Sequence, residues 1–148
     1  MSTTDRIERE TVIDAPVDRV WSLLTEAEHL GRWFGDAGAE IDLRPGGALA
    51  LHWAEHGTAH GRVEQIEPGR RLALRWGAEP GAFEPSTSTH VEFTLRPEGD
   101  ATRLRVVESG FDSLAGSPAE RAAKHADNTE GWAIELGHLR DHARRVAV

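Results

Sequence analysis

The chain has 148 residues, enough for one domain with its own hydrophobic core and too few for a second domain of similar size. Lys and Arg number 17 against 25 Asp and Glu, a formal net charge of −8 that argues against DNA or RNA as a partner. Without cysteine the chain can form no disulfide, thiolate metal site or cysteine nucleophile. The polar N-terminus is unlike a signal peptide and no segment is apolar enough to span a membrane, which favours a cytoplasmic protein without a membrane partner. The Ala-, Arg- and Gly-rich composition suits a bacterial protein.

The first part of the chain predicts a strand followed by two short helices. Residues 6 to 14 alternate in polarity as a strand does, and "DAPVDRVWSLLT" then changes to helical spacing, with Pro16 at the helix start. A second helix is expected from about Ala27 to Trp33. Turn residues then separate short runs of period two as far as Ser109, which predicts antiparallel strands joined by hairpins.

Three hairpin turns set the register of these strands, because pairing must place apolar residues opposite apolar residues on the buried face. The turns are centred on His56, at Pro68-Gly69 and at Gly99-Asp100. They predict these pairs: Leu49 with Val63, Leu51 with Gly61, Trp53 with Ala59, Val63 with Leu74, Gly61 with Trp76, Leu95 with Leu104, Phe93 with Val106, and Val91 with Glu108. Glu108 is therefore expected to point inward, on a face that also takes Ile41, Leu43 and Leu72.

The C-terminal segment supplies a cover for this apolar face. It is expected to form a helix from Pro118, after Ser117 as a cap, almost to Val148, with a break near residues 127 to 131. The expected order is thus a strand, two short helices, six more strands and a long helix. The apolar stripe of the long helix, continued backwards, consists of Val146, Ala143, Leu139, Leu136, Trp132, Asn128 and His125.

This order of elements resembles the helix-grip fold of the START-like superfamily, also called SRPBCC. "IDAPVDRVWSLLT" is similar to its strand-to-helix entry, "EAEHLGRWF" to its second helix and "GRVEQIEPGRRLALRW" to its central hairpin. "VVESGF", and "NTEGW" followed by "LGHLRDH", resemble the branch named after the C-terminal domain of the heat-shock protein 90 ATPase activator. The resemblance implies an α+β fold in which a sheet of about seven strands curves around the long C-terminal helix. It also implies, for many members, an apolar cavity between sheet and helix.

Glycines on the two facing surfaces also suggest that the space between sheet and helix is not filled. Gly61 lies on the inward face between the indoles of Trp53 and Trp76, so large rings border a position without a side chain. Gly131 and Gly137 in the covering helix cost about 1 kcal/mol each relative to Ala, which suggests close packing or a ligand beside them. The alternative is that the rings fold over the glycines and fill the gap.

Glu108, in the run "VVESGFDSL", is a functional candidate because of its inward orientation. A carboxylate that faces an apolar interior is costly unless it is protonated or has hydrogen-bond partners. The nearest inward polar groups are expected to be Asn128, His125 and Gln65. Two kinds of role stay open: Glu108, at a strand end, ties down the loop before the long helix or meets solvent at the cavity mouth, or it contacts a ligand or acts as an acid or base.

The histidines do not predict a metal site. The strand register turns His52 and His60 outward as a cross-strand pair, while His56 lies in a turn without acidic or thiol ligands around it. His138 and His142, four residues apart, are expected on a solvated flank of the long helix. Neither a metal nor another cofactor is therefore predicted.

The leading functional hypothesis is a small protein that binds an apolar or aromatic small molecule between sheet and helix. The sequence lacks the nucleophile elbow, the phosphate-binding loop and the dinucleotide fingerprint. The alternatives are a polyketide cyclase-like or hydrolase-like enzyme that uses Glu108 as its acid or base, and a chaperone ATPase-activator-like interaction module. A homodimer is left open. The candidate ligand contacts are Trp33, Leu51, Trp53, Gly61, Val63, Leu74, Trp76, Val91, Phe93, Val106, Glu108, Phe111, His125, Asn128, Trp132 and Leu136.

Overall fold

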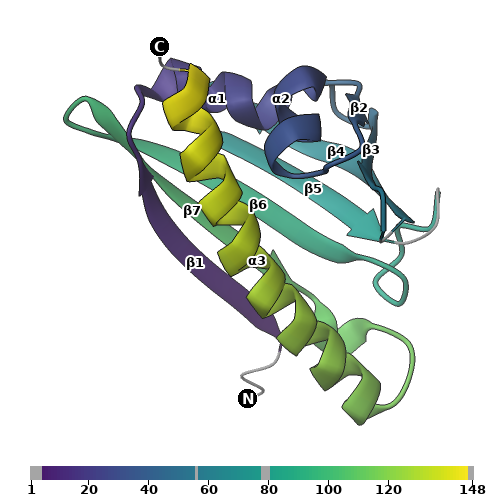
Figure 1. The fold of residues 1–148 in the computed structure, drawn as a ribbon. Coiled ribbons are helices and arrows are strands. Elements are labelled where there is room, and N and C mark those ends of the chain that lie inside the picture. The colour runs from purple at the N-terminus through teal and green to yellow at the C-terminus, as the bar shows by residue number, and fades with distance from the viewer. Residues whose placement is uncertain (1–4, 56, 78–80, 147–148) are drawn as a thin grey trace.

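The chain folds into a curved antiparallel sheet with α-helices packed on one face (Figure 1). The computed structural model describes residues 5–55, 57–77 and 81–146. Within them the sheet has seven strands in the order β1-β7-β6-β5-β4-β3-β2. The elements are β1 (Arg6–Ile13), α1 (Val17–Thr25), α2 (Ala27–Trp33), β2 (Ala39–Ile41), β3 (Ala48–Trp53), β4 (Gly57–Glu67), β5 (Arg71–Gly77), β6 (Thr89–Glu98), β7 (Ala101–Ser109), the 3-10 turn η1 (Phe111–Ser113) and α3 (Pro118–Val146).

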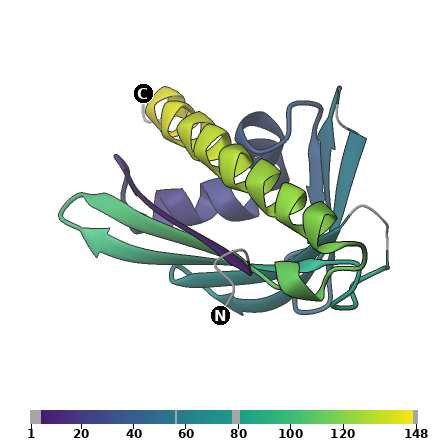
Figure 2. The same cartoon turned by 90° about the horizontal axis from the view of Figure 1, so that it is seen from below.

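Consecutive strands from β2 to β7 pair as neighbours, and β1 closes the order at the edge beside β7. Figure 2 shows the helices together on the same side of the sheet, with α3 running across it. The short helices α1 and α2 lie between β1 and β2 along the chain. This arrangement confirms the predicted helix-grip architecture.

The long helix α3 begins with a reciprocal pair of hydrogen bonds. The Glu120 backbone N–H donates to Ser117 Oγ at 3.1 Å, and the Ser117 backbone N–H donates to Glu120 Oε1 at 3.0 Å. The break expected near residues 127 to 131 is wrong, because α3 is continuous from Pro118 to Val146. Asn128 and Trp132 lie one turn apart and bond to the same carboxylate, which holds this part of the helix on the sheet. No helix of the described residues is long and apolar enough to cross a membrane.

The strand register agrees with the sequence-based pairing in β6 and β7, where Val91 lies opposite Glu108. In β3 and β4 the observed pairing is shifted by two residues, so that Leu51 faces Ala59 and Trp53 faces Gly57. The shift moves His52 opposite Thr58 and ends the predicted cross-strand pairing of His52 with His60, which lies opposite Ala50. Because side chains alternate with a period of two, the shift leaves the inward face unchanged. His56, expected in this turn, lies outside the described residues.

The turn between β4 and β5 is one residue longer than predicted. Glu67 pairs with Arg71, which leaves a three-residue loop, and a β-bulge between Val63 and Gln65 restores the predicted pairing of Val63 with Leu74. The bulge turns Gln65 to the outer face, where it is exposed and accepts a hydrogen bond from Arg71. Gln65 is therefore no neighbour of Glu108.

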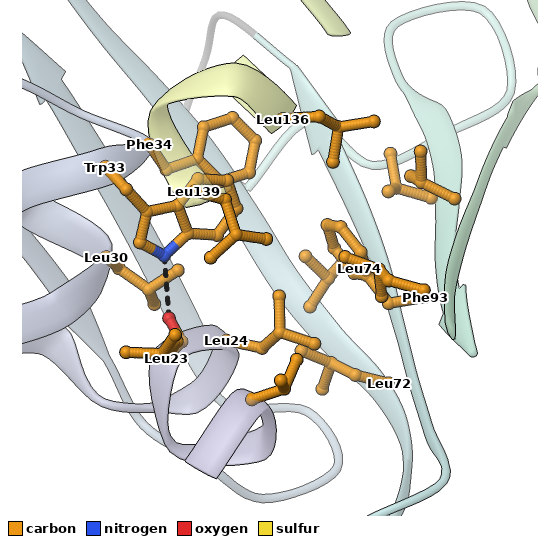
Figure 3. Close-up of a cluster of buried hydrophobic side chains, with 14 of the residues drawn as sticks. Leu23, Leu24, Leu30, Trp33, Phe34, Leu72, Leu74, Phe93, Leu136 and Leu139 are labelled. Carbon is orange, nitrogen blue, oxygen red and sulfur yellow. Dashed lines mark hydrogen bonds between the residues drawn. The ribbon is translucent and has the colours of Figure 1, made fainter. Parts of the chain in front are cut away.

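Apolar residues fill the space between the sheet and the helices (Figure 3). Leu43, expected on the inward face, is instead 40% exposed, because β2 ends at Ile41 and Leu43 lies in the loop that follows. The opposite face of the sheet carries charged cross-strand pairs. In these, Arg71 bonds Glu92 and Arg105 bonds Glu8. One face of the sheet is thus apolar, and any site among apolar side chains has to lie on the side of the helices.

His142, expected on a solvated flank, is buried and only 4% exposed. Its Nε2 lies 2.9 Å from Nδ1 of His29, so the pair joins α2 to α3. Burial lowers the pKa of His142, and His29, Arg32 and Arg145 lower it further, against an opposing effect of Glu28. His138 on the neighbouring turn is exposed, as predicted.

We expect His142 to lower the free energy of unfolding as the pH drops below about 6.5, the pKa of an unperturbed histidine. Below it the unfolded chain binds a proton at His142 that the folded protein resists, so stability is lost, by at most about 1.4 kcal/mol per pH unit from one group. Burial also raises the pKa of Glu135 to about 8, which changes stability in the opposite direction over this range, so the contribution of His142 is the difference in slope between wild type and His142→Gln in urea unfolding from about pH 5 to 8. His142→Gln should lose this contribution, whereas His138→Gln, on an exposed turn, should keep the wild-type slope. Equal slopes in wild type and His142→Gln would contradict the assignment.

Candidate functional site

The Glu108 carboxyl group lies inside the protein, surrounded by hydrogen-bond donors, and the residue is 1% exposed. Oε1 accepts hydrogen bonds from Trp132 Nε1 at 2.9 Å and Asn128 Nδ2 at 3.2 Å. Oε2 accepts from Trp76 Nε1 at 3.0 Å, Thr89 Oγ1 at 2.6 Å and Asn128 Nδ2 at 3.0 Å. The inward orientation predicted from the strand register is confirmed, and so is the partnership with Asn128.

Four elements bring these donors together. Glu108 is on β7, and Thr89 lies on the neighbouring strand β6 with its side chain on the same face. Trp76 on β5 lies directly opposite Thr89. Asn128 and Trp132 come from successive turns of α3, because residues four apart share one face of a helix. One carboxylate therefore connects three strands of the sheet to the covering helix.

The donor set matches the ionised form of Glu108. An ionised carboxylate only accepts hydrogen bonds, and an indole N–H can only donate. Among the described residues no Lys or Arg forms an ion pair with Glu108, so neutral dipoles carry the stabilisation of its charge. Proton transfer by Glu108 would first require some of these hydrogen bonds to break. The geometry supports an anchoring role over an acid or base role.

His125, the other predicted partner of Glu108, bonds elsewhere. Its Nε2 lies 2.9 Å from the backbone carbonyl oxygen of Arg6 on β1. Its ring packs edge-on against buried Phe111, with 5.1 Å between the ring centroids. The expectation that His125 adjoins Glu108 is wrong, because the ring ties α3 to the edge strand and to η1.

Phe34 and the indoles of Trp53, Trp76 and Trp132 form an aromatic cluster beside Glu108. The Phe34 ring centroid lies 6.1 Å from that of Trp53, 5.2 Å from that of Trp76 and 5.4 Å from that of Trp132. The rings of Trp76 and Trp132 stack at 5.5 Å. Phe93 meets Trp132 edge-on at 5.7 Å. Glu108 fixes two of the three indoles through their N–H groups.

Among the residues that the structure describes, no open cavity of the predicted kind is bordered by Trp53, Trp76 and Trp132. The rings contact Phe34, which occupies the space between them, and the neighbouring void of about 10 Å³ is only water-sized. Gly61 leaves no space either, since a Cβ there would lie 3.1 Å from the Leu49 side chain. The void is lined by Leu24, Leu30, Phe34, Ile41, Leu49, Leu51, Leu72, Leu74 and Phe93.

One end of the aromatic cluster reaches the surface. Trp53 and Trp76 point to the inner side of the sheet yet are only partly buried, whereas Phe34 and Trp132 are buried. Among the described residues, a Cβ added to Gly131 would meet no atom within 4 Å. Gly131 directly precedes Trp132 on α3, and the position that its side chain would occupy is open space. Close packing does not explain this glycine.

The remaining predicted contacts are core residues in this structure. Trp33 stacks on Phe34 at 4.8 Å, and its Nε1 donates to the Leu23 carbonyl oxygen at 2.7 Å (Figure 3). The other predicted contacts that are buried in the core are Leu51, Val63, Leu74, Val91, Val106 and Leu136. That Trp33 and these residues contact a ligand stays a prediction.

Sequence reasoning did not include Phe34 and Thr89 in the site. Thr89 lies two residues before Val91, so the alternation of β6 already placed it on the inward face. Phe34 directly follows α2 and had no comparable signal, because its direction depends on how the helix packs. Alternation along a strand thus identifies an inward polar residue such as Thr89, but it gives no information on an aromatic residue at a helix end such as Phe34.

We expect Glu108→Gln to lower the free energy of unfolding by about 2–4 kcal/mol. Whichever way the amide is oriented, its NH₂ group faces the indole N–H of Trp76 or Trp132 and leaves a buried donor unpaired. Glu98→Gln, which changes an exposed pair with Arg103, should cost less than about 1 kcal/mol. Urea unfolding of the two variants provides the comparison, and equal costs would contradict the donor arrangement.

Comparison with known proteins shows which family model matches this chain. Residues 14–144 match the family model described as activator of Hsp90 ATPase homolog 1-like protein. A search of curated proteins finds no match. Among solved structures, CalU16 from Micromonospora echinospora is 31% identical with a TM-score of 0.70, over 93% of this chain and 75% of CalU16.

Two further structures share the fold. DynU16, from the dynemicin biosynthetic locus, has a TM-score of 0.74 at 24% identity over 95% of this chain, which spans only 47% of DynU16. The Aha1 dimer from Colwellia psychrerythraea has a TM-score of 0.70 at 19% identity, over 92% of this chain and 93% of that one. Since the family model covers nearly the whole helix-grip fold, from the end of β1 to the last turn of α3, the chain belongs to the family of activator of Hsp90 ATPase homolog 1-like proteins.

Proposed function

We propose that the protein binds an apolar or aromatic small molecule at the open end of the aromatic cluster. The observation that carries this proposal is the pair of partly exposed, inward-facing indoles of Trp53 and Trp76, in the same cluster as Trp132, which follows Gly131 on α3. Indole faces bury large apolar areas and stack on other rings. The space beside Gly131 gives an aromatic body a place to lie against α3.

The hydrogen bonds of the indoles indicate which ring moves when a ligand enters. Trp76 and Trp132 are held by Glu108, and Trp33 is held by the Leu23 carbonyl oxygen. Among the described residues the Trp53 indole has no hydrogen-bond partner, and it contacts the cluster edge-on through Phe34. A ligand can displace Trp53 without breaking a hydrogen bond. The carboxylate meanwhile keeps the other two rings of the cluster in place.

Similarity to DynU16, from a biosynthetic locus, also supports a small molecule as the ligand. An enzyme that uses Glu108 as acid or base is less well supported, because both carboxylate oxygens are engaged. A protein-interaction module is the second candidate, favoured by the family and by the similarity to an Aha1 dimer. We place the protein in the cytoplasm in either case, and a homodimer is compatible with both.

We expect neutral aromatic alcohols with one to three rings, such as 2-phenylethanol, to shift the indole N–H signals of Trp53, Trp76 and Trp132 in ¹H–¹⁵N spectra. The signals of Trp21 and Trp33, outside the open end, should stay in place. At about 100 times its dissociation constant the ligand should stabilise the fold by about 2.7 kcal/mol in a thermal-unfolding assay.

Gly131 offers a matched pair of variants for this experiment. Gly131→Ala should stabilise the helix by up to about 1 kcal/mol, because the methyl group meets no neighbour. Gly131→Leu should fold and lose binding, because its side chain fills the space beside the indoles. Ala133→Leu, on the exposed face of α3, serves as the control and should keep binding. If neither these alcohols nor charged compounds with the same aromatic bodies shift the three signals in the wild type, the proposed function is wrong.

A further inference from the structure

The Glu135 carboxyl group is the polar group at the open end whose bonding is incomplete. Glu135 lies on α3 one turn after Gly131 and Trp132, so it shares their face of the helix. Its side chain is 16% exposed, and its Oε1 lies 3.5 Å from Nδ1 of His138. Its Oε2 is buried and has no hydrogen-bond partner among the described residues. A buried acceptor without a donor costs free energy that a ligand donor would recover.

Asp36, in the segment between α2 and β2, is the second carboxyl group here. Its Oδ1 accepts a hydrogen bond from the Ala54 backbone N–H at 2.7 Å, and its own N–H donates to the His52 carbonyl oxygen at 3.0 Å. These bonds fix Asp36 beside the end of β3, where Trp53 lies. Burial, and then the charge of Asp36, raise the pKa of Glu135 from 4.5 to about 8. Near neutral pH Glu135 therefore carries a proton, at a position where a cation such as an ammonium group would be favourable.

We propose that the ligand of the open end carries a protonated amine, which Glu135 and Asp36 bind while its aromatic body lies against Trp53 and Trp76. This inference rests on the proposed function and narrows its ligand class. An ammonium group brings donors to the unpaired oxygen, and carboxylates and indole faces both attract cations. The charge of Asp36 repels an anionic ligand, which separates this ligand class from aromatic acids of the same shape.

Replacement of a proton by an amine at Glu135 has a measurable consequence. With a pKa of about 8, Glu135 is mostly protonated at neutral pH, and it loses this proton when the ammonium group binds. The charged groups that face it are Asp36 from the α2–β2 segment and His138 from its own helix. Binding of the amine should therefore release close to one proton near neutral pH, and binding of a neutral alcohol should release none.

Sets of three ligands test the inference; the members of a set share one aromatic group and differ in carrying an amine, an alcohol or a carboxylate. Examples are 2-phenylethylamine, 2-phenylethanol and phenylacetate, together with their naphthyl and biphenyl counterparts. Isothermal titration in buffers of different ionisation enthalpy gives affinity and proton release together. We expect each amine to bind the wild type about tenfold more tightly than its alcohol, a difference of about 1.4 kcal/mol, and the acid to bind most weakly. Glu135→Gln and Asp36→Asn should each reduce this preference, and Glu135→Gln should also abolish proton release. Glu130→Gln, an exposed change of equal charge on α3, is the control and should preserve both.

The possible outcomes separate the two proposals. If amines and alcohols bind the wild type equally well, or if the preference persists in Glu135→Gln, the amine inference is overturned and the proposed function stands. If no member of any set binds, the proposed function is overturned, and the inference with it. A preference lost together with proton release in Glu135→Gln, in a variant that melts cooperatively, supports both.

Discussion

The buried carboxylate of Glu108 is the interaction on which the arrangement of sheet and helix depends. Its oxygens gather Trp76 and Thr89 from two strands and Asn128 and Trp132 from α3. A charge in an apolar interior is tolerated only when its acceptor positions are satisfied, so these donors cannot move independently. Together with the contacts of His142, His125 and Arg140, this polar contact fixes the position of the helix, while the apolar contacts supply most of the stabilisation.

The fold could be predicted from the sequence because the alternation of side chains along a strand tolerates some errors in strand register. The pairing of β3 with β4 was misplaced by two residues, yet the inward face was assigned correctly, since a shift of two keeps each side chain on its side. The bulge beside Val63 could not be predicted. A two-residue turn and a three-residue loop compensated by a bulge give the same pairing of Val63 with Leu74. Gln65, within the bulge, was the residue placed on the wrong side as a result.

Less of the candidate site could be predicted, because it depends on side-chain directions and helix packing. Alternation along β7 predicted the inward Glu108, and helical spacing predicted that Asn128 would reach it. Whether the indoles enclose space or fill it depends on Phe34, whose position follows from the packing of α2 against the sheet. His142 was misplaced for a related reason. Its face of α3 is solvated in isolation and becomes buried only where His29 of α2 covers it.

The two outer strands of the sheet have a consequence for self-association. A free strand edge can template another strand, and many proteins shorten or cover such edges. At one side β2 has only three residues. At the other, α3 reaches over β1, where Arg140 donates to Thr11 Oγ1 at 2.8 Å and His125 bonds the carbonyl oxygen of Arg6. Extension of the sheet by a second chain is thus disfavoured at both ends. Copies of this protein that meet in a crowded solution would therefore associate more readily through helices, loops or the charged outer face than by adding strands to the sheet.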